Sequence, residues 1–163
     1  HYLHDQVNVG DTVQLSPPTG DFFLDRRAET PVVLLSGGVG QTPMLSMLNS
    51  LTNAGGERQI HYVHSALNSN VHGFADHVRS LVGKHNNLKQ TLFYDAPTEQ
   101  CEGHDFAGLT DLNKIRDQID LPDAHFYFCG PLGYMSMVSD TLKSWNVPAD
   151  RIHFEVFGPH KEV

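Results

Sequence analysis

Cysteine, positive charge and long apolar runs are all scarce in this chain. Its 163 residues include two cysteines, Cys101 and Cys129, too few for a disulfide framework or for an iron–sulfur cluster held by four thiolates. Unpaired cysteines are typical of a reducing compartment, so we expect a cytoplasmic protein. No apolar run approaches the roughly 20 residues that span a bilayer, and the chain does not open on a signal peptide. We therefore expect no membrane span.

Positive charge is outweighed by negative charge. The chain has 11 Lys and Arg against 19 Asp and Glu, a formal net charge of −8. Its longest basic run is the pair Arg26-Arg27. A nucleic-acid backbone would be repelled by such a surface, so nucleic acid is excluded as the expected partner.

Histidine is the abundant residue that could indicate a metal site. In the predicted strand IHYVHS, His61 and His64 are three residues apart and point to opposite faces. His72 and His77 are not spaced as one helical turn, and no cysteine or carboxylate completes a ligand set of the usual spacing. We therefore predict no metal site.

Short apolar runs alternate with helical patterns after residue 30. Strands are predicted at 31–36, 59–65, 88–95, 124–130 and 151–157. The intervening helices include one that Thr110 would cap, spanning residues 110–119. Five strands separated by four helices predict an α/β domain built on a doubly wound, five-stranded parallel sheet with helices on both faces.

The first 28 residues follow a different pattern. VNVGDTVQLSPPTGDFFL alternates apolar and polar residues between glycine and proline turns, which is typical of antiparallel strands. The stretch is too short to close a barrel by itself. We therefore predict that residues 1–28 are a fragment of an antiparallel β-barrel and that residues 29–163 form a separate domain. Because His1 is not an initiator residue, we expect the chain to be part of a longer protein.

A glycine cluster interrupts the most apolar stretch, LLSGGVGQTPML. Gly37, Gly38 and Gly40 allow the backbone to turn sharply and to lie close to a ligand. Thr42 is placed to cap the next helix, and Pro43 suits its first turn. At the carboxyl end of a parallel strand, such a loop predicts a pyrophosphate site. The alternative is that the glycines only make a tight turn.

Two more glycine loops are predicted at the same edge of the sheet. CGPLGYM follows the fourth strand, with Cys129 at its tip, and EVFGPHKEV ends the chain with Glu155 and Phe157. Cys129 could instead be a small buried hydrophobic residue, and Phe157 could be plain core. Three glycine-bearing loops at one edge favour a site in which Phe157 stacks on a ligand.

Together, GVGQTPML, YFCGPLGYM and EVFGPHK resemble the reductase portion of flavohaemoglobins, the nitric oxide dioxygenases of the ferredoxin-NADP-reductase-like superfamily. The resemblance covers the whole chain and implies an NAD(P)H-dependent flavin oxidoreductase whose barrel binds FAD. It assigns NAD(P)H to Gly38, Val39, Gly40, Gln41, Thr42 and Pro43. It assigns FAD to Val156, Phe157, Gly158 and Pro159. It places Cys129 near the hydride-transfer site. It also implies that Glu155 adjusts the reduction potentials of the flavin and the haem.

The resemblance also implies partners that are not part of this sequence. Hydride would pass from NAD(P)H to FAD, and single electrons would pass to haem in a globin domain of the same polypeptide, where nitric oxide becomes nitrate. The family's Arg-x-Tyr-Ser flavin motif is absent from the sequence. Two alternatives stay open: the reductase of another electron-transfer chain, and a nucleotide-binding module without catalysis.

The choice between NADH and NADPH depends on the charge near the end of the second strand. Sites for NADP usually supply an arginine there. The stretch HSALNSNVHGFADHV has no Arg or Lys before Arg79. We therefore expect NADH to be preferred.

Overall fold

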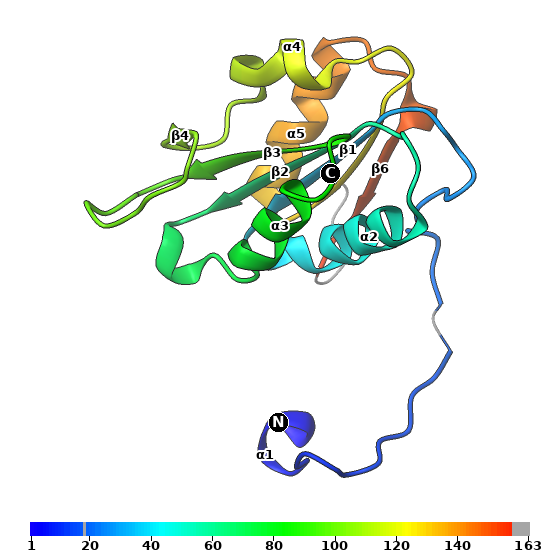
Figure 1. Ribbon diagram of the computed structural model, residues 1–163, viewed down its shortest axis with the longest axis vertical. Coiled ribbons are helices and arrows are strands. Elements are labelled where there is room, and N and C mark those ends of the chain that lie inside the picture. The colour runs from blue at the N-terminus through cyan, green and yellow to red at the C-terminus, as the bar shows by residue number, and fades with distance from the viewer. Residues whose placement is uncertain (18, 158–163) are drawn as a thin grey trace.

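The fold is a six-stranded, wholly parallel sheet between two helical layers (Figure 1). The structure is a computed structural model that describes residues 1–17 and 19–157. The spatial order of the strands is β4-β3-β2-β1-β5-β6. Their bounds are β1 Val32–Gly37, β2 Ile60–Ala66, β3 Leu88–Tyr94, β4 Phe106–Ala107, β5 His125–Cys129 and β6 Ile152–Glu155.

The helices occupy both faces of the sheet, which confirms the predicted doubly wound fold. Figure 1 shows α2 and α3 on one face and α4 and α5 on the other. The α-helices are α1 Tyr2–Asp5, α2 Gln41–Ala54, α3 Ala75–Val82, α4 Arg116–Ile119 and α5 Leu132–Ser144. Four 3-10 turns are η1 Gly38–Gly40, η2 Ser69–Val71, η3 Leu112–Ile115 and η4 Ala149–Arg151.

The strand order places a topological switch beside β1. The chain runs outward from β1 through β2 to β3 and β4, and then returns to β5 on the other side of β1. Crossovers on the two sides therefore lie on opposite faces, and the space beyond the carboxyl end of β1 is left open for a ligand. The glycine loop that follows β1 lies at this point.

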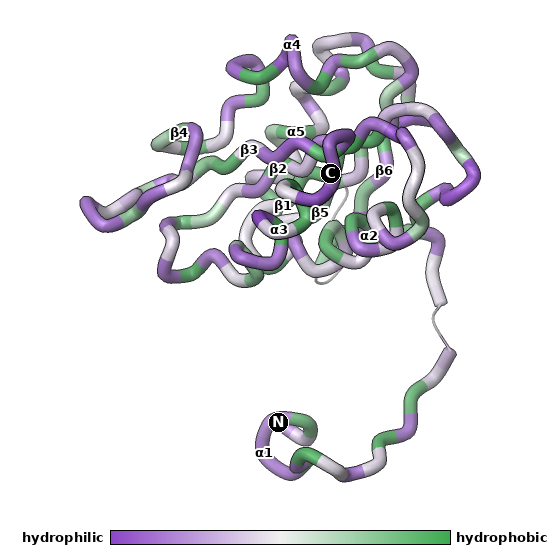
Figure 2. Tube along the Cα trace, viewed as in Figure 1, coloured by the Kyte–Doolittle hydropathy of each residue, from purple (hydrophilic) through white to green (hydrophobic). Residues whose placement is uncertain are grey.

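Apolar side chains fill both faces of the central strands. β1 is buried along its whole length, as its unbroken apolar run predicts. One core cluster joins Leu34 and Tyr62 of the sheet to Met44 of α2, and the other joins Val33 to residues of α4 and α5. Figure 2 shows the same distribution, with hydrophobic residues gathered in the central strands and polar residues on the outer loops.

Two predictions about the sheet and its helices need correction. The sheet has a sixth strand, β4, which is only two residues long and pairs with the end of β3; a strand this short leaves no periodic pattern in the sequence. The predicted helix at 110–119 is divided into η3 and α4, and Asp111 rather than Thr110 caps it. The Asp111 carboxylate accepts a hydrogen bond from the Asn113 amide at 3.1 Å.

The antiparallel strands predicted within the first 28 residues do not form in the part of that stretch that the structure describes. The short helix α1 is its only regular element there. A strand needs a partner for its backbone groups, and no other segment described here supplies one. The apolar side chains of Val9, Leu15 and Phe23 are consequently exposed. The assignment of these residues to a barrel, and the boundary at residue 28, stay predictions.

The chain joins the domain through a docked stretch at residues 22–30. Phe22 and Leu24 pack against the core cluster beneath α2. Arg58 donates hydrogen bonds to the carbonyl oxygens of Thr30 at 2.7 Å and Asp25 at 2.9 Å. A cavity of about 510 Å³ borders this contact at the amino ends of the strands, on the opposite edge of the sheet from the glycine loop.

Candidate functional site

The glycine loop leaves the backbone open at Gly38. Gly38 has a φ of +52°, and a Cβ atom placed on it would meet nothing within 4 Å. Gly38 and the neighbouring Val39 are exposed. The positive φ explains the glycine at this position, and the result is an open stretch of backbone beyond the end of β1.

Gly40 has a packing role that the sequence did not indicate, and its assignment to NAD(P)H stays a prediction. It is buried, and a Cβ atom on it would overlap the carbonyl group of Cys129 and would lie 2.6 Å from the Gly130 amide nitrogen. A Cβ on Gly130 would lie 2.8 Å from the Tyr134 ring, and one on Gly37 would lie 3.0 Å from it. The absence of side chains at these glycines lets the two loops pack against each other.

The amino end of α2 faces the open loop without a side-chain cap. Thr42, predicted to cap the helix, instead donates a hydrogen bond to the Val39 carbonyl at 3.1 Å, because the helix already begins at Gln41. Pro43 lies in the first turn, as predicted, and the first turn has no acidic residue. Gln41 is buried, and its Oε1 has no hydrogen-bond partner among the described residues. The Gln41 backbone amide donates to the carbonyl oxygens of Gly38 and Val39, and the helix dipole favours an anion at this end of α2.

Cys129 and Glu155 come together with the glycine loop across three strands. The register pairs Ser36 with Cys129 and Cys129 with Glu155. The Cys129 side chain is fully buried, and burial, together with the Glu155 carboxylate, raises the pKa of its thiol to about 11. Cys129 is therefore a neutral thiol at neutral pH.

The last described residues extend from the same edge. Val156 packs against the core on the α5 face, whereas the Phe157 ring is 53% exposed and is not part of the core. Gly158 and Pro159, the other residues predicted to contact FAD, lie outside the described residues. The structure thus brings the loops after β1 and β5 to one edge with the end of β6, and leaves an aromatic ring exposed there.

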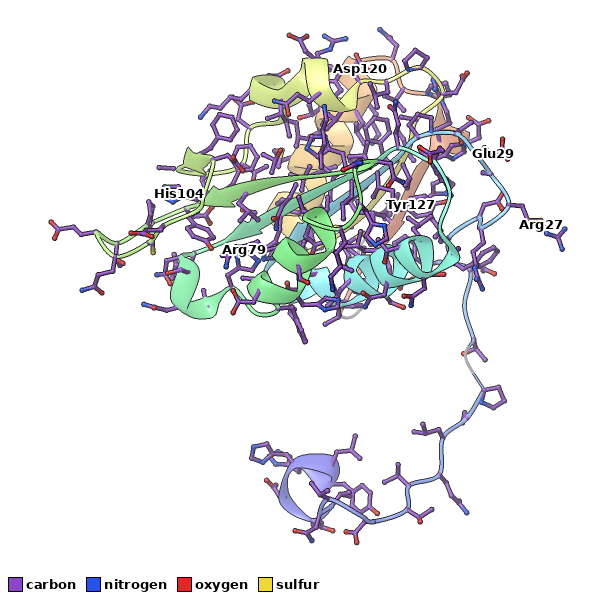
Figure 3. The ribbon with its side chains drawn as sticks, in the orientation of Figure 1. Arg27, Glu29, Arg79, His104, Asp120 and Tyr127 are labelled. Atoms are coloured by element: carbon purple, nitrogen blue, oxygen red, sulfur yellow. The ribbon has the colours of Figure 1, made fainter. Side chains whose placement is uncertain are left out.

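A cavity of about 380 Å³ at the carboxyl ends of β2 and β3 was not predicted. Its lining residues are Ser69, His72, Phe74, Ala75, Asp76, His77, Arg79, Tyr94 and Glu102. Figure 3 shows Arg79 on α3 at this side of the molecule. Phe74 has a φ of +59° and an exposed ring, an unusual conformation for an aromatic residue and one that is often found at binding sites. No sequence pattern predicts a positive φ at Phe74.

Buried imidazoles lie between this cavity and the glycine loop. His64 Nδ1 lies 2.8 Å from Ser36 Oγ, and the His64 ring lies beside that of His72, with 4.5 Å between their centroids. Burial lowers the pKa of His64 to about 3, so His64 is neutral at neutral pH. His61, on the opposite face as predicted, contacts Thr91 at 2.8 Å. Among the described residues, no three His, Cys, Asp or Glu side chains are arranged to hold a metal ion.

The second cysteine, Cys101, lies beside the unpredicted cavity. Its Sγ accepts hydrogen bonds from the backbone amides of Ser69 and Thr98 and lies 3.0 and 3.3 Å from their hydroxyl oxygens. Hydrogen bonds from Ser69 and Thr98 lower the pKa of the thiol to about 7. The two cysteines therefore differ strongly in acidity.

Iodoacetamide at pH 7 is expected to alkylate Cys101 far faster than Cys129. The thiolate is the nucleophile, and the pKa values of about 7 for Cys101 and 11 for Cys129 set the fraction of each thiol that is ionised at pH 7. Because the more acidic thiolate is also less reactive, the alkylation rates should differ on the order of a hundredfold. Peptide mass spectrometry measures both rates, and that of Cys101 should rise as pH increases through 7. Ser69→Ala should slow the labelling of Cys101 at pH 7. Equal labelling of both cysteines would contradict the assignment.

Comparisons with known proteins agree with this geometry. Residues 34–140 match the model of the oxidoreductase NAD-binding domain. The chain is 45% identical over 159 residues to a flavohemoprotein of Bordetella pertussis, and 43% identical over 162 residues to one of Bacillus cereus. These alignments cover 96% and 98% of the chain but 40% of each relative. The chain thus spans well under half the length of these curated relatives.

Solved structures show the same fold. The crystal structure of the flavohem-like FAD/NAD-binding domain of nitric oxide dioxygenase from Vibrio cholerae superposes with a TM-score of 0.82 at 38% identity, over 98% of this chain and 64% of that one. The cytochrome b5 reductase domain of Ulva prolifera nitrate reductase superposes with a TM-score of 0.78 at 20% identity, over 92% and 61%. At that identity the second likeness establishes the fold alone.

No helix in the described part of the chain is both long and apolar enough to cross a membrane. The family match covers the strand, the glycine loop and the helix that build the open edge, together with the second loop after β5. The chain belongs to the oxidoreductase NAD-binding domain family.

Proposed function

We propose that this chain binds NADH at the carboxyl edge of its sheet and passes hydride from it to FAD. The observation that carries the proposal is the open backbone at Gly38, before the amino end of α2 and at the topological switch point. Backbone amides there suit the pyrophosphate, since they supply donors and the positive end of the helix dipole. The unpartnered Oε1 of buried Gln41 can accept a hydrogen bond from a ribose hydroxyl of the ligand, not from its phosphates.

The arrangement of the other loops suits hydride transfer at a flavin. The exposed Phe157 ring offers a stacking surface for an isoalloxazine or nicotinamide ring. Phe157 lies two residues beyond the end of β6, the strand next to β5. When bound, FAD accepts two electrons as hydride and can release them one at a time. Cys129, neutral and buried, presents no negative charge to the transferred hydride, and Glu155 supplies a carboxylate one strand away.

The activity proposed for the whole parent protein is based on the names of its relatives. The similar proteins are flavohemoproteins and a nitric oxide dioxygenase, so we propose that the parent protein of this chain delivers electrons from FAD to haem in a globin domain and converts nitric oxide to nitrate. Gly158 and Pro159 would join Phe157 at the flavin. We also propose a cytoplasmic location, which is supported by the two free cysteines, Cys101 and Cys129.

Gly38→Ala is expected to weaken NADH binding by about tenfold or more, because its Cβ would stand between the backbone and the pyrophosphate. Gly55→Ala is the matched control. Gly55 also has positive φ, +71°, and open space around it, but it lies at the other end of α2. Gly38→Ala should cost about 1 to 2 kcal/mol of stability. Gly55→Ala should cost up to about 3 kcal/mol, because the ψ of Gly55, −168°, places it in a region that essentially only glycine adopts. Calorimetric titration with NADH compares the two, and equal affinities would reject the phosphate loop.

A further inference from the structure

The cavity at the carboxyl ends of β2 and β3 lies within reach of a dinucleotide held at the glycine loop. The register pairs Gly37 of β1 with Ser65 of β2, just before the cavity. Gln41, at the start of α2, also touches the cavity loop, because its Nε2 would lie 3.2 Å from a Cβ atom on Gly73. If the pyrophosphate binds at the glycine loop, as proposed above, this cavity receives the other end of the ligand.

The side chains of the cavity suit a nucleoside. The strained Phe74 carries an exposed ring on the cavity wall, available for stacking on a base. His72 is 7% exposed, and its Nδ1 lies 2.9 Å from the Tyr94 hydroxyl oxygen. Its Nε2 has no hydrogen-bond partner within the described residues. A ligand hydroxyl would satisfy this buried nitrogen, which otherwise carries the cost of desolvation.

The charges of the cavity differ from what the sequence alone indicated. Arg79 is 13 residues beyond the end of β2 in the sequence, but helix α3 places it next to the end of that strand in space. It is the one Lys or Arg among the described residues that line the cavity. Its Nη1 lies 2.7 Å from Asp76 Oδ1. Glu102 adds a second carboxylate. The cavity thus contains a guanidinium suited to a phosphate, but that guanidinium is already paired and is outnumbered by acids.

We infer that the Asp76–Arg79 ion pair, together with Glu102, makes this cavity select NADH over NADPH, with Asp76 as the specificity-determining residue. A 2′-phosphate would have to take Arg79 from Asp76 and then face two carboxylates. A free 2′-hydroxyl can donate a hydrogen bond to either carboxylate without displacing anything. The inference rests on the proposed NADH site, and it locates selectivity on the first turn of α3.

The inference is tested with two fragments of the dinucleotides, adenosine 5′-monophosphate and adenosine 2′,5′-bisphosphate. Wild type is expected to bind the monophosphate more tightly. Asp76→Asn frees Arg79 and should shift the affinity ratio toward the bisphosphate by about two- to fivefold, the scale of one exposed ion pair. Adding Arg79→Met to Asp76→Asn should abolish the shift. Calorimetry gives the ratios, and high salt should reduce the shift because the pair is exposed.

Asp120→Asn is the matched control, because it removes another exposed helical ion pair, with Arg116 at 3.0 Å, on the opposite edge of the sheet. It should leave the ratio unchanged. An unchanged ratio in Asp76→Asn, or a shift that survives Arg79→Met, would overturn the inference while leaving the NADH site intact. Fragments that bind without displacing NADH would also overturn it. Failure of wild type to bind NADH at all would instead reject the proposed function, and this inference with it.

Discussion

Gly40→Val is expected to destabilise the fold by about 3 kcal/mol or more, rather than simply to weaken NADH binding. A Cβ atom on Gly40 would overlap the Cys129 carbonyl and crowd the Gly130 amide. Both obstacles are backbone atoms, so no rotamer change can relieve the contact. The loops after β1 and β5 would have to separate, and with them the packing of Tyr134 on Gly37 and Gly130.

Urea unfolding of Gly40→Val beside Gly133→Ala separates this explanation from a general effect of changing loop glycines. Gly133 lies in α5, directly after the second loop, and a Cβ on it would meet nothing within 4 Å. Because alanine favours a helix, Gly133→Ala should be neutral or stabilising by up to about 1 kcal/mol. If Gly40→Val unfolded at the same urea concentration as wild type and lost only affinity for NADH, contact with the ligand rather than with the neighbouring loop would explain why residue 40 is a glycine.

The polypeptide of residues 1–163 is expected to be colourless after purification, with an affinity for FAD more than a hundredfold weaker than micromolar. The flavin contacts that its described residues offer are an exposed Phe157 ring and a row of strand ends. An aromatic contact contributes about 0.5 to 1.5 kcal/mol beyond area burial, whereas a micromolar cofactor needs about 8 kcal/mol. No strand forms in the described residues before β1, so a barrel surface for the flavin must come from elsewhere.

Absorbance near 450 nm and titration with added FAD measure this directly. A longer polypeptide of the parent protein that includes the family's Arg-x-Tyr-Ser segment should be yellow and should reduce ferricyanide with NADH. Phe157→Ala should change FAD affinity measurably only in that longer polypeptide, where the rest of the flavin site is present. Stoichiometric FAD in residues 1–163 would contradict the proposed division of the site between barrel and NADH domain.

Much of the fold follows from local patterns. Unbroken β-branched and aromatic runs such as 32–35 and 125–128 indicate parallel strands that are buried on both faces. Amphipathic spacing indicates the helices between them, and a glycine turn followed by Pro43 indicates where a helix begins. Since the carboxyl ends of parallel strands meet at one edge, the convergence of the loops after β1 and β5 with the end of β6 was also predictable, and the structure confirms it.

By itself, the sequence determined the α/β class, the place of the glycine loop and the edge of the sheet on which that loop lies, because each depends on periodicity and backbone preference within a short segment. Tertiary structure decided the roles within that site. Gly38 faces open space while Gly40 faces another loop, and Arg79 comes back to the end of β2 already paired with Asp76. These outcomes depend on how helices and loops that are distant in sequence pack against one another. The identity of a glycine or an arginine does not specify which residues it will contact in the folded protein.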